Sequence, residues 1–150
     1  YLLKESTGRP ITVVSEIGVR LPASLTSSGR AMLSHLSAAQ IRALFPNSHA
    51  FVDRTGKGPT NLAQLKELLA KERTQGYASE SGSVTLGHSS VAVAVFDHLG
   101  EPIAAINIVY RDSTISRSDQ QVLVDVVKDS ARDLTVRLGG RVPSSIKDRP

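Results

Sequence analysis

The clearest alternation of hydrophobic and polar positions lies between residues 90 and 109, which read SVAVAVFDHLGEPIAAINIV. Two apolar arms flank a short turn, so the pattern predicts a β-hairpin. If Asp97 pairs with Pro102 across a four-residue loop, then Ala94 faces Ala105, Ala92 faces Asn107 and Ser90 faces Val109, and side chains on one face recur every second residue. One face then carries Ser90, Ala92, Ala94, Ala105, Asn107 and Val109, and the other carries Val91, Val93, Val95, Ala104, Ile106 and Ile108.

We call the first of these sets the small-residue face. The opposite face is bulky enough to form an ordinary packed core, whereas the small-residue face leaves space and gathers its polar groups at the end away from the turn. A cavity lined by small apolar groups and a few polar ones suits a small ligand. A helix that approaches the sheet closely would also need small side chains there, so both interpretations stay open.

Two short helices are predicted in the first third of the chain. Apolar residues recur at helical spacing from Thr26 to Leu36. Ser37 and Gln40 then form a capping box for a second helix over Ala38 to Phe45, and Pro46 stops it.

A third helix is predicted to open at Asn61 with Gln64 and to close at Gly76. Its apolar stripe consists of Leu62, Leu65, Leu68 and Leu69.

A last helix follows the hairpin. Ser118 with Gln121 is predicted to cap its start, and the pair Gly139 and Gly140 to end it. The residues that recur every three or four positions along it are Leu123, Val127, Ala131, Leu134 and Leu138.

The remaining segments are predicted to be strands, loops or a tail. The runs Tyr1 to Lys4 and Ile11 to Ser15 are expected as strands around a turn. Residues 53–59 and the Ser-rich stretch 76–87 are expected as loops, and residues 140–150 as a flexible basic tail. Strands and helices that mix without a βαβ rhythm indicate an α+β fold with an antiparallel sheet.

Composition narrows the class of protein. The chain has 150 residues, of which 40% are hydrophobic and 21% charged, which is ordinary for one soluble globular domain. No apolar run approaches the roughly 20 residues of a membrane-spanning helix. The absence of Cys excludes disulfides and thiolate chemistry and fits a reducing cytoplasm. The chain starts without Met or a secretion signal, and we expect it to be a piece of a longer protein.

The net charge of +4 raises the question of nucleic-acid binding. Basic residues alternate with acidic ones through most of the chain, and the local excess lies between Arg137 and Arg149. Aromatic residues make up only 4% of the chain, too few for a platform on which single strands would stack. We therefore expect a solvated surface and no direct DNA contact by this segment.

Enzymatic chemistry is not expected, and neither is a metal or a cofactor. The four His residues have no metal-ligand spacing. The run from His88 to Ser90 has the residue types of a base and a nucleophile, but no Gly-x-Ser-x-Gly elbow surrounds it. The stretch from Arg54 to Pro59 lacks the first glycine and the hydroxyl residue of a phosphate-binding loop.

Four pieces of the sequence resemble the IclR family of bacterial transcription regulators. Residues 18–33, GVRLPASLTSSGRAML, are similar to the family's RLP…TASGRALL segment. Gly76-Tyr77-Ala78, the Val95-Phe96-Asp97 run before a GEPI turn, and the Ala104-Ala105-Ile106 strand follow in the family's order.

The resemblance implies the family's C-terminal effector-binding domain, a GAF-like antiparallel sheet flanked by helices, over residues 1–139. In the family, a winged helix-turn-helix DNA-binding domain precedes this domain, and we expect it to be absent from this chain. The implied function is sensing of a small organic acid or aromatic effector, with homodimers or homotetramers whose arrangement modulates promoter binding. A purely structural oligomerisation domain and a small-molecule enzyme are the alternatives.

The resemblance also implies a set of effector-binding positions. Ser27 and Ser28 open a helix, where free N–H groups favour an anion, and Glu80 has the chemistry to accept a hydrogen bond from a ligand. The competing interpretation makes the serines helix caps and Glu80 a solvated side chain. The full set comprises Leu21, Ser27, Ser28, Glu80, Ser90, Asn107 and Val109.

The chain departs from the family pattern at several of these positions. The family often has Cys at Ser90, Pro at Ala94 and a second acidic residue at Ser83, and Ser at both Asn107 and Val109. An amide and an isopropyl group in place of two hydroxyls change hydrogen bonding and volume. Recognition of glyoxylate or pyruvate is therefore not carried over to this chain.

Overall fold

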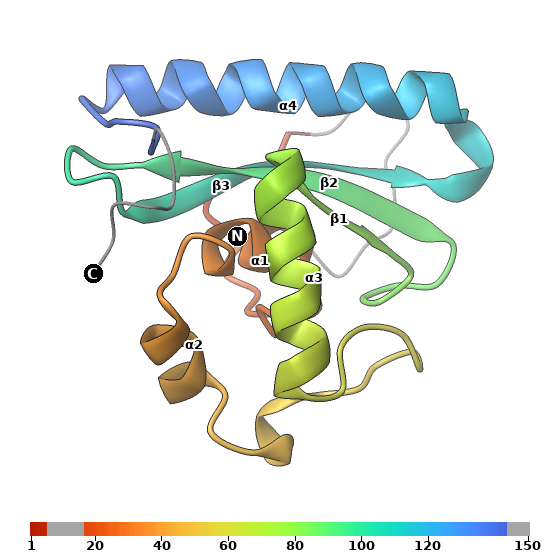
Figure 1. The fold of residues 1–150 in the computed structure, drawn as a ribbon. Helices are drawn as coiled ribbons and strands as arrows, with labels where there is room; N and C mark the ends of the chain where they lie inside the picture. The colour runs from red at the N-terminus through yellow and green to blue at the C-terminus, as the bar shows by residue number, and fades with distance from the viewer. Residues whose placement is uncertain (6–16, 144–150) are drawn as a thin grey trace.

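A three-stranded antiparallel sheet with helices on both sides forms the centre of the structure (Figure 1). The computed structural model describes residues 1–5 and 17–143. Within them the elements in chain order are α1 (Ser27–Leu33), α2 (Ala38–Leu44), the 3₁₀ turn η1 (Ser48–Ala50), α3 (Leu62–Gln75), β1 (Ala78–Ser81), β2 (His88–Phe96), β3 (Pro102–Arg111), η2 (Asp112–Thr114) and α4 (Arg117–Arg137).

The sheet has the order β1-β2-β3, so β2 is its central strand. The predicted hairpin register is confirmed, with Ala94 opposite Ala105, Ala92 opposite Asn107, and Ser90 opposite Val109. The predicted α+β class with an antiparallel sheet is confirmed with it. The two faces deduced from alternation are therefore the two real faces of the sheet.

The predicted turn of the hairpin is wrong by one residue. Phe96, and not Asp97, lies opposite Pro102, because the register shifts between Val95 and Phe96. Asp97 instead closes a tighter turn, in which its N–H donates to the Glu101 carbonyl at 3.0 Å. Its carboxylate also accepts from the backbone N–H groups of Leu99 and Glu101, each at 2.9 Å. These hydrogen bonds favour the shorter loop, and a β-bulge absorbs the extra residue.

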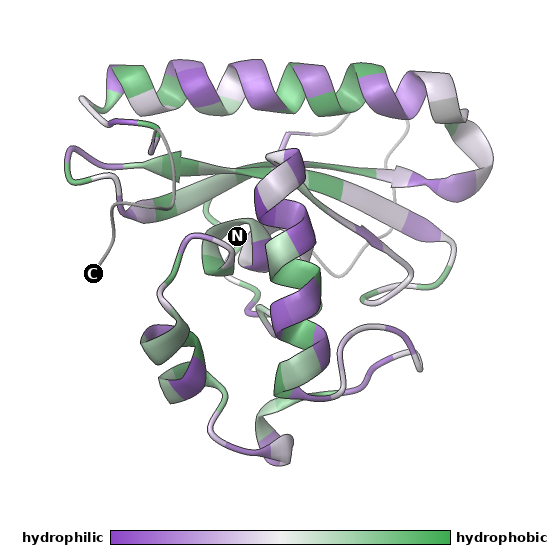
Figure 2. Ribbon diagram, viewed as in Figure 1, coloured by the Kyte–Doolittle hydropathy of each residue, from purple (hydrophilic) through white to green (hydrophobic). Residues whose placement is uncertain are grey.

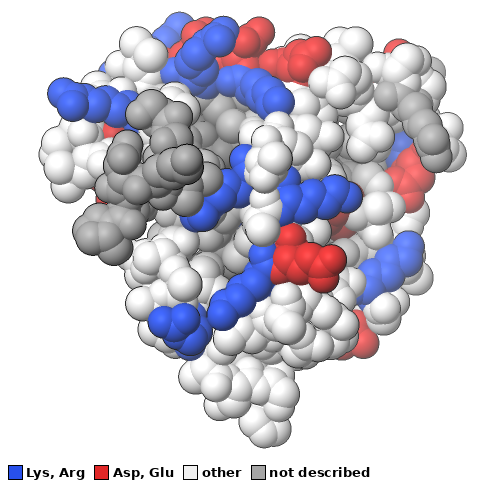
Figure 3. Space-filling model, in the orientation of Figure 1, with Lys and Arg blue, Asp and Glu red and all other residues white. Residues whose placement is uncertain are grey.

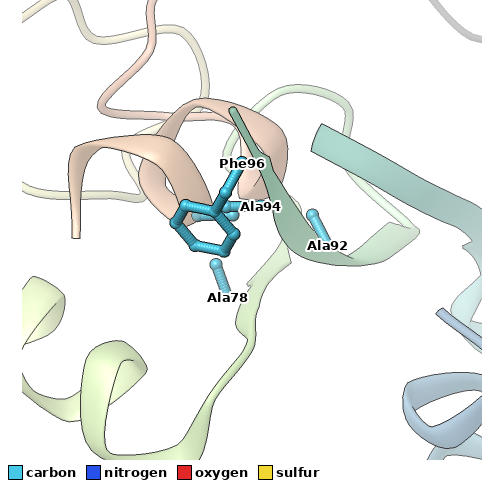
Figure 4. Packing of buried hydrophobic residues seen from close by; sticks show 5 residues of the cluster. Ala78, Ala92, Ala94 and Phe96 are labelled. Atoms are coloured by element: carbon cyan, nitrogen blue, oxygen red, sulfur yellow. The ribbon is translucent and has the colours of Figure 1, made fainter. Parts of the chain in front are cut away.

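Each face of the sheet has its own packing partner. Helix α4 lies along the bulky face, and α1 packs against the small-residue face (Figure 1). The cluster beneath α1 contains small side chains and one ring, shown in Figure 4: Ala31, Ala78, Ala92, Ala94 and Phe96. The cluster beneath α4 contains Val91, Tyr110, Val124 and Val127. The close approach of a helix, left open from the sequence, is therefore observed over part of the small-residue face.

A separate apolar cluster joins the helices on the α1 side. Its buried members are Leu33, Ile41, Phe45, Leu65 and Leu69. Figure 2 shows the hairpin strands hydrophobic through most of their length and the helices mixed in character, as expected of elements with one buried face.

The capping signals predicted the starts of α2 and α3 correctly. The Ser37–Gln40 capping box is present. Asn61 accepts from the Gln64 N–H, and the left-handed Gly76 with φ of 77° ends α3. Helix α1 begins at Ser27 but ends at Leu33, three residues earlier than the predicted Leu36.

Helix α4 starts two residues earlier than predicted. Its N-cap is Ser116, whose hydroxyl accepts from the Asp119 N–H at 3.2 Å, so Ser118 is not the cap. The buried positions are Val124, Val127, Ala131 and Thr135. The predicted stripe was therefore partly wrong, and Leu138 at its end is 53% exposed.

The strand predictions outside the hairpin were less accurate than the hairpin prediction. Residues 1–5 form no strand, although the Gly18 N–H donates to the Tyr1 carbonyl and the Tyr1 amino group to the Val19 carbonyl. These two hydrogen bonds attach Tyr1 to residues 18 and 19, but they do not continue into a β-ladder along residues 1–5. The predicted strand Ile11 to Ser15 and residues 144–150 of the predicted tail lie outside the described residues. Residues 78–81, within the stretch predicted as a loop, form the strand β1. Their mostly polar sequence does not indicate a strand.

Charged side chains of both signs lie on the visible face of the molecule (Figure 3). On the face drawn in Figure 3, basic and acidic side chains are interspersed and do not form one basic field. Among the described residues, no helix is long and apolar enough to cross a bilayer.

Candidate functional site

Three polar side chains from three elements meet on the small-residue face. The Ser27 Oγ of α1 lies 2.7 Å from the Ser90 Oγ of β2. Ser90 Oγ in turn donates to the Glu80 Oε1 of β1 at 3.0 Å. All three residues are buried, with exposures of 1% for Ser27, 4% for Ser90 and 9% for Glu80. We call this set the Ser27–Ser90–Glu80 network.

The network has a defined direction of hydrogen bonding. An ionised carboxylate accepts only, and a serine hydroxyl has a single proton to donate. Because the Ser90 proton is directed to Glu80, the Ser27 hydroxyl must donate to the Ser90 oxygen. The lone pairs of Ser27 therefore remain as the acceptor at the outer end of the network.

Glu80 is a buried acid without a direct cation. Its second oxygen accepts from the Ser83 N–H at 3.0 Å, and among the described residues it forms no ion pair. Burial raises the pKa of the Glu80 carboxyl, and the hydrogen bonds from Ser83 and Ser90 and the more distant charge of Arg30 offset only part of that rise. Burial, and to a smaller extent the negative charge of Glu80, also raise the pKa of the Tyr1 hydroxyl.

Arg30 is fully engaged elsewhere. Its Nε donates to the two oxygens of Glu72 at 3.0 and 3.1 Å, and both residues of this pair are 2% exposed. Its terminal nitrogens donate to the carbonyls of Ser24, Leu25 and Ser79. Arg30 thereby joins α1 to α3 and to the residue before Glu80, and it holds the elements of the network in place.

The structure brings together some of the predicted site residues and not others. Ser27, Ser90 and Glu80 are in direct contact. On β3, the half-buried Asn107 and Val109 lie opposite Ala92 and Ser90 in the adjacent strand. Leu21, before α1, and Ser28, within α1, are half-buried, and among the described residues no hydrogen bond joins them to the network.

The competing interpretations of these residues are partly excluded. The N-cap of α1 is Thr26, whose Oγ1 accepts from the Gly29 N–H at 3.0 Å, so neither Ser27 nor Ser28 is the cap. Glu80 is not a solvated side chain. The helix has only seven residues, and its dipole is correspondingly small as a source of anion binding.

Sequence reasoning missed the Arg30–Glu72 pair and the contact of Glu80 with the Ser83 backbone. The pair joins residues 42 positions apart, and no local pattern marks such a contact. Position Ser83, noted only for its lack of a carboxylate, contributes its backbone N–H in place of a side chain. The burial of the charged side chains of Arg30 and Glu72 follows no apolar pattern, so the sequence does not predict it.

The loop between η1 and α3 has a small hollow of its own. The loop after η1 encloses a hollow of about 20 Å³, lined by Phe51, Lys57 and Pro59 among others, which is room for about one water. The loop is held by a hydrogen bond of 2.6 Å from Thr55 Oγ1 to the Gly82 carbonyl. Across residues 1–5 and 17–143, no group of three His, Asp or Glu side chains is arranged to hold a metal ion.

The fold and site define an α+β domain with a polar, buried network at the end of a small-residue face. The chain matches the family model described as "Bacterial transcriptional regulator IclR C-terminal" over residues 1–136. It therefore belongs to the IclR family of bacterial transcriptional regulators and corresponds to their C-terminal domain.

Individual relatives agree with this assignment. The acetate operon repressor of Salmonella typhimurium is 32% identical over 126 residues, which cover 83% of this chain and 45% of the relative. The crystal structure of the Agobacterium tumefaciens repressor BlcR superposes with a TM-score of 0.79 at 31% identity, covering 84% of this chain and 51% of that one. The Thermotoga maritima IclR gives a TM-score of 0.80 at 27% identity, covering 88% and 53%. The chain thus spans about half the length of these relatives.

Proposed function

We propose that this chain is the effector-sensing domain of an IclR-type regulator. A small organic acid or aromatic effector binds at the small-residue face, and binding alters the arrangement of subunits in a homodimer or homotetramer. DNA is bound by a separate winged helix-turn-helix domain of the full protein, in the cytoplasm, and not by this segment.

The observation that carries the proposal is the buried Ser27–Ser90–Glu80 network. Burial of a carboxylate without a paired cation is costly, and a purely structural core would be more stable with apolar residues there. Polar side chains from three elements converge at one end of a face that is otherwise small and apolar. Such convergence is typical of a site that orients a small ligand.

The same geometry supports a route from ligand to subunit arrangement. A ligand on this network would contact α1, β1 and β2 at once, and Arg30 connects α1 and β1 rigidly to α3. A ligand shifts an equilibrium only by its difference in affinity between two states. The proposal therefore requires that α1 sits differently against the sheet in the two states of the regulator.

The proposed role is non-catalytic. The Ser90 hydroxyl donates to a carboxylate and receives a hydrogen bond from Ser27, so neither serine has an imidazole partner that would activate it as a nucleophile. The matched relatives are named as regulators and repressors, which supports the same conclusion.

A structural oligomerisation domain that binds no ligand is the second candidate. It is supported by the packing of α1 directly on Ala92 and Ala94, which fills part of the small-residue face. The two candidates differ in whether the polar end of that face receives a ligand.

Binding, turnover and assembly together test the proposal. Candidate effectors would be titrated calorimetrically into the chain, followed by NMR of the ligand over hours and by light scattering with and without it. A sensor binds the ligand, leaves it chemically unchanged and alters its own assembly. Consumption of the ligand would show an enzyme, and self-association without any binding would show the structural domain.

Asn107→Leu provides the matched variant, because leucine adds apolar bulk on the half-buried β3 side of the face. It is expected to abolish binding and leave the chain folded. Ile103→Leu, on the same strand at a 48% exposed position, is the control and is expected to bind as the wild type does.

A further inference from the structure

His88 opens β2 two residues before Ser90, so both side chains lie on the small-residue face. Two residues along a strand are about 7 Å apart, a distance that one small ligand spans. The neighbour of His88 on the β1 side is Gly82, whose N–H donates to the His88 carbonyl at 2.8 Å. Gly82 has no side chain, and the end of the Lys57 side chain lies where one would stand, with Nζ 2.9 Å from an ideal Cβ. His88 is therefore the next residue after Ser90 on this face of β2.

The two ring nitrogens of His88 differ in their surroundings. Nδ1 lies 3.3 Å from the Leu86 carbonyl oxygen. Because a carbonyl only accepts, Nδ1 carries the proton of this hydrogen bond, and Nε2 of the neutral ring is a bare acceptor. Nε2 is buried and has no hydrogen-bond partner. Buried polar atoms are nearly always paired, so an unpaired one on this face is notable.

At the Glu80 and His88 end of the site the open hydrogen-bonding groups are acceptors, whereas the Asn107 amide on β3 and the Lys57 ammonium beside Gly82 carry donors. The Glu80 carboxylate, the Ser27 oxygen and the His88 Nε2 all accept. Arg30, whose charge lowers the pKa of Glu80, donates its hydrogen bonds to Glu72 and three carbonyls. Arg111 lies opposite His88 in β3 and is exposed.

We infer that His88 Nε2 is a further contact of the effector site, and that the part of the effector reaching Glu80 and His88 carries hydrogen-bond donors, a hydroxyl or an amide N–H, and not a free carboxylate. This inference rests on the proposed function and names the chemistry of its ligand. A donor at this point satisfies Nε2, whose isolation otherwise leaves a buried acceptor unpaired.

The tautomer is tested without any ligand. A long-range ¹H–¹⁵N spectrum of the wild-type chain at slightly alkaline pH, with His88 assigned by comparison with His88→Leu, reports which nitrogen carries the proton. Protonation at Nδ1 with a bare Nε2 is expected. Protonation at Nε2 would overturn the inference whatever the ligand.

The ligand chemistry is tested with matched probes in a thermal-shift experiment. The pairs are benzamide and benzoate, lactamide and lactate, and mandelamide and mandelate, each at millimolar concentration. The amide of each pair is expected to raise the unfolding midpoint more than the acid. His88→Leu should abolish that difference, and His98→Leu, at the exposed hairpin turn, should retain it.

The outcomes separate this inference from the proposed function. If probes bind the wild type and His88→Leu equally, the proposed function stands and the role of His88 is wrong. If the acids bind better than the amides and Arg111→Gln removes that binding, the site takes an anion and the inference fails. If no probe shifts the midpoint of the wild type, both the site and the inference are contradicted.

Discussion

Ser27 Oγ and Ser90 Oγ lie 2.7 Å apart, although 63 residues separate them along the chain. The contact fixes the start of α1 onto the central strand of the sheet and continues to Glu80 at 3.0 Å. A helix, a central strand and an edge strand are therefore joined by one directional chain of hydrogen bonds.

Removing the middle of this chain should cost more than removing its end. Ser90→Ala leaves the buried Glu80 Oε1 without its donor, and we expect a loss of about 1–3 kcal/mol in the free energy of unfolding. Ser27→Ala removes one neutral hydrogen bond and should cost about 1 kcal/mol. Urea unfolding measures both. Ser81→Ala, exposed at the end of β1, is the control and should change stability by less than about 0.5 kcal/mol. Equal effects of all three would show that the network is not formed.

Removing one partner of the buried Arg30–Glu72 ion pair should strongly lower the free energy of unfolding. Arg30→Met leaves a buried carboxylate unpaired, and we expect a loss of about 3–5 kcal/mol. The control is the pair Arg132–Asp129, whose side chains are 66% and 68% exposed at a distance of 2.7 Å. Arg132→Met should cost less than about 1 kcal/mol. A mild effect of Arg30→Met in chemical denaturation would contradict the burial of this pair.

The raised pKa of Glu80 predicts a specific dependence of stability on pH. The folded protein holds the Glu80 proton more tightly than the unfolded chain, whose ordinary carboxyl pKa is 4.5. The stabilisation by this proton is complete below that value, and it is lost as the pH rises through the higher pKa of the folded state.

Glu80→Gln tests this prediction because glutamine does not titrate. The free energy of unfolding, measured from mildly acidic to neutral pH, should fall with pH more steeply in the wild type than in Glu80→Gln. Glu72, whose pKa burial also raises, is present in both proteins, so its contribution cancels in the comparison. Parallel curves for the two proteins would show that Glu80 is not perturbed.

Gly29 in α1 should not tolerate alanine, despite the higher helix propensity of that residue. A Cβ at position 29 would lie 2.4 Å from the Ala23 carbonyl oxygen and 2.5 Å from the Ala23 Cα. Alanine ordinarily gains about 1 kcal/mol over glycine inside a helix, and the contact with backbone atoms should reverse that sign. Thermal unfolding of Gly29→Ala would be compared with Ser28→Ala on the same helix, which should be close to neutral. A rise in the midpoint of Gly29→Ala would show that α1 is not packed this closely.

How far the sequence predicts this structure depends on the range of the interactions involved. The Ser37–Gln40 and Asn61–Gln64 caps act within one turn of helix, and both were predicted. The hairpin register follows from alternation over neighbouring strands, and Ala92 does lie opposite Asn107. The predicted hairpin turn and the predicted start of α4 were wrong by one and two residues, because hydrogen bonds to the Asp97 and Ser116 side chains set the actual positions.

Contacts between distant segments were beyond local patterns. Strand β1 was missed because its sequence, ASES, has neither β-branched residues nor an apolar alternation, although Ala78 and Glu80 are buried by the neighbouring β2. Resemblance to a family supplied Ser27, Glu80 and Ser90 as site positions, but their mutual contact became visible only in the fold. The bare Nε2 of His88 depends on the Leu86 carbonyl and has no signature in the sequence.

The most direct test of the central claim is a dye-based thermal-shift screen of the chain against organic acids, their amides, aromatic acids and sugar acids, run in parallel on Asn107→Leu. A ligand at about 100 times its dissociation constant stabilises the folded state by about 2.7 kcal/mol, which for a domain of this size raises the midpoint by roughly 5–10 °C. We predict such a shift for the wild type with at least one chemical class, and its loss in Asn107→Leu. Midpoints that stay unchanged across the panel, or that rise equally in both proteins, would contradict an effector site on the small-residue face.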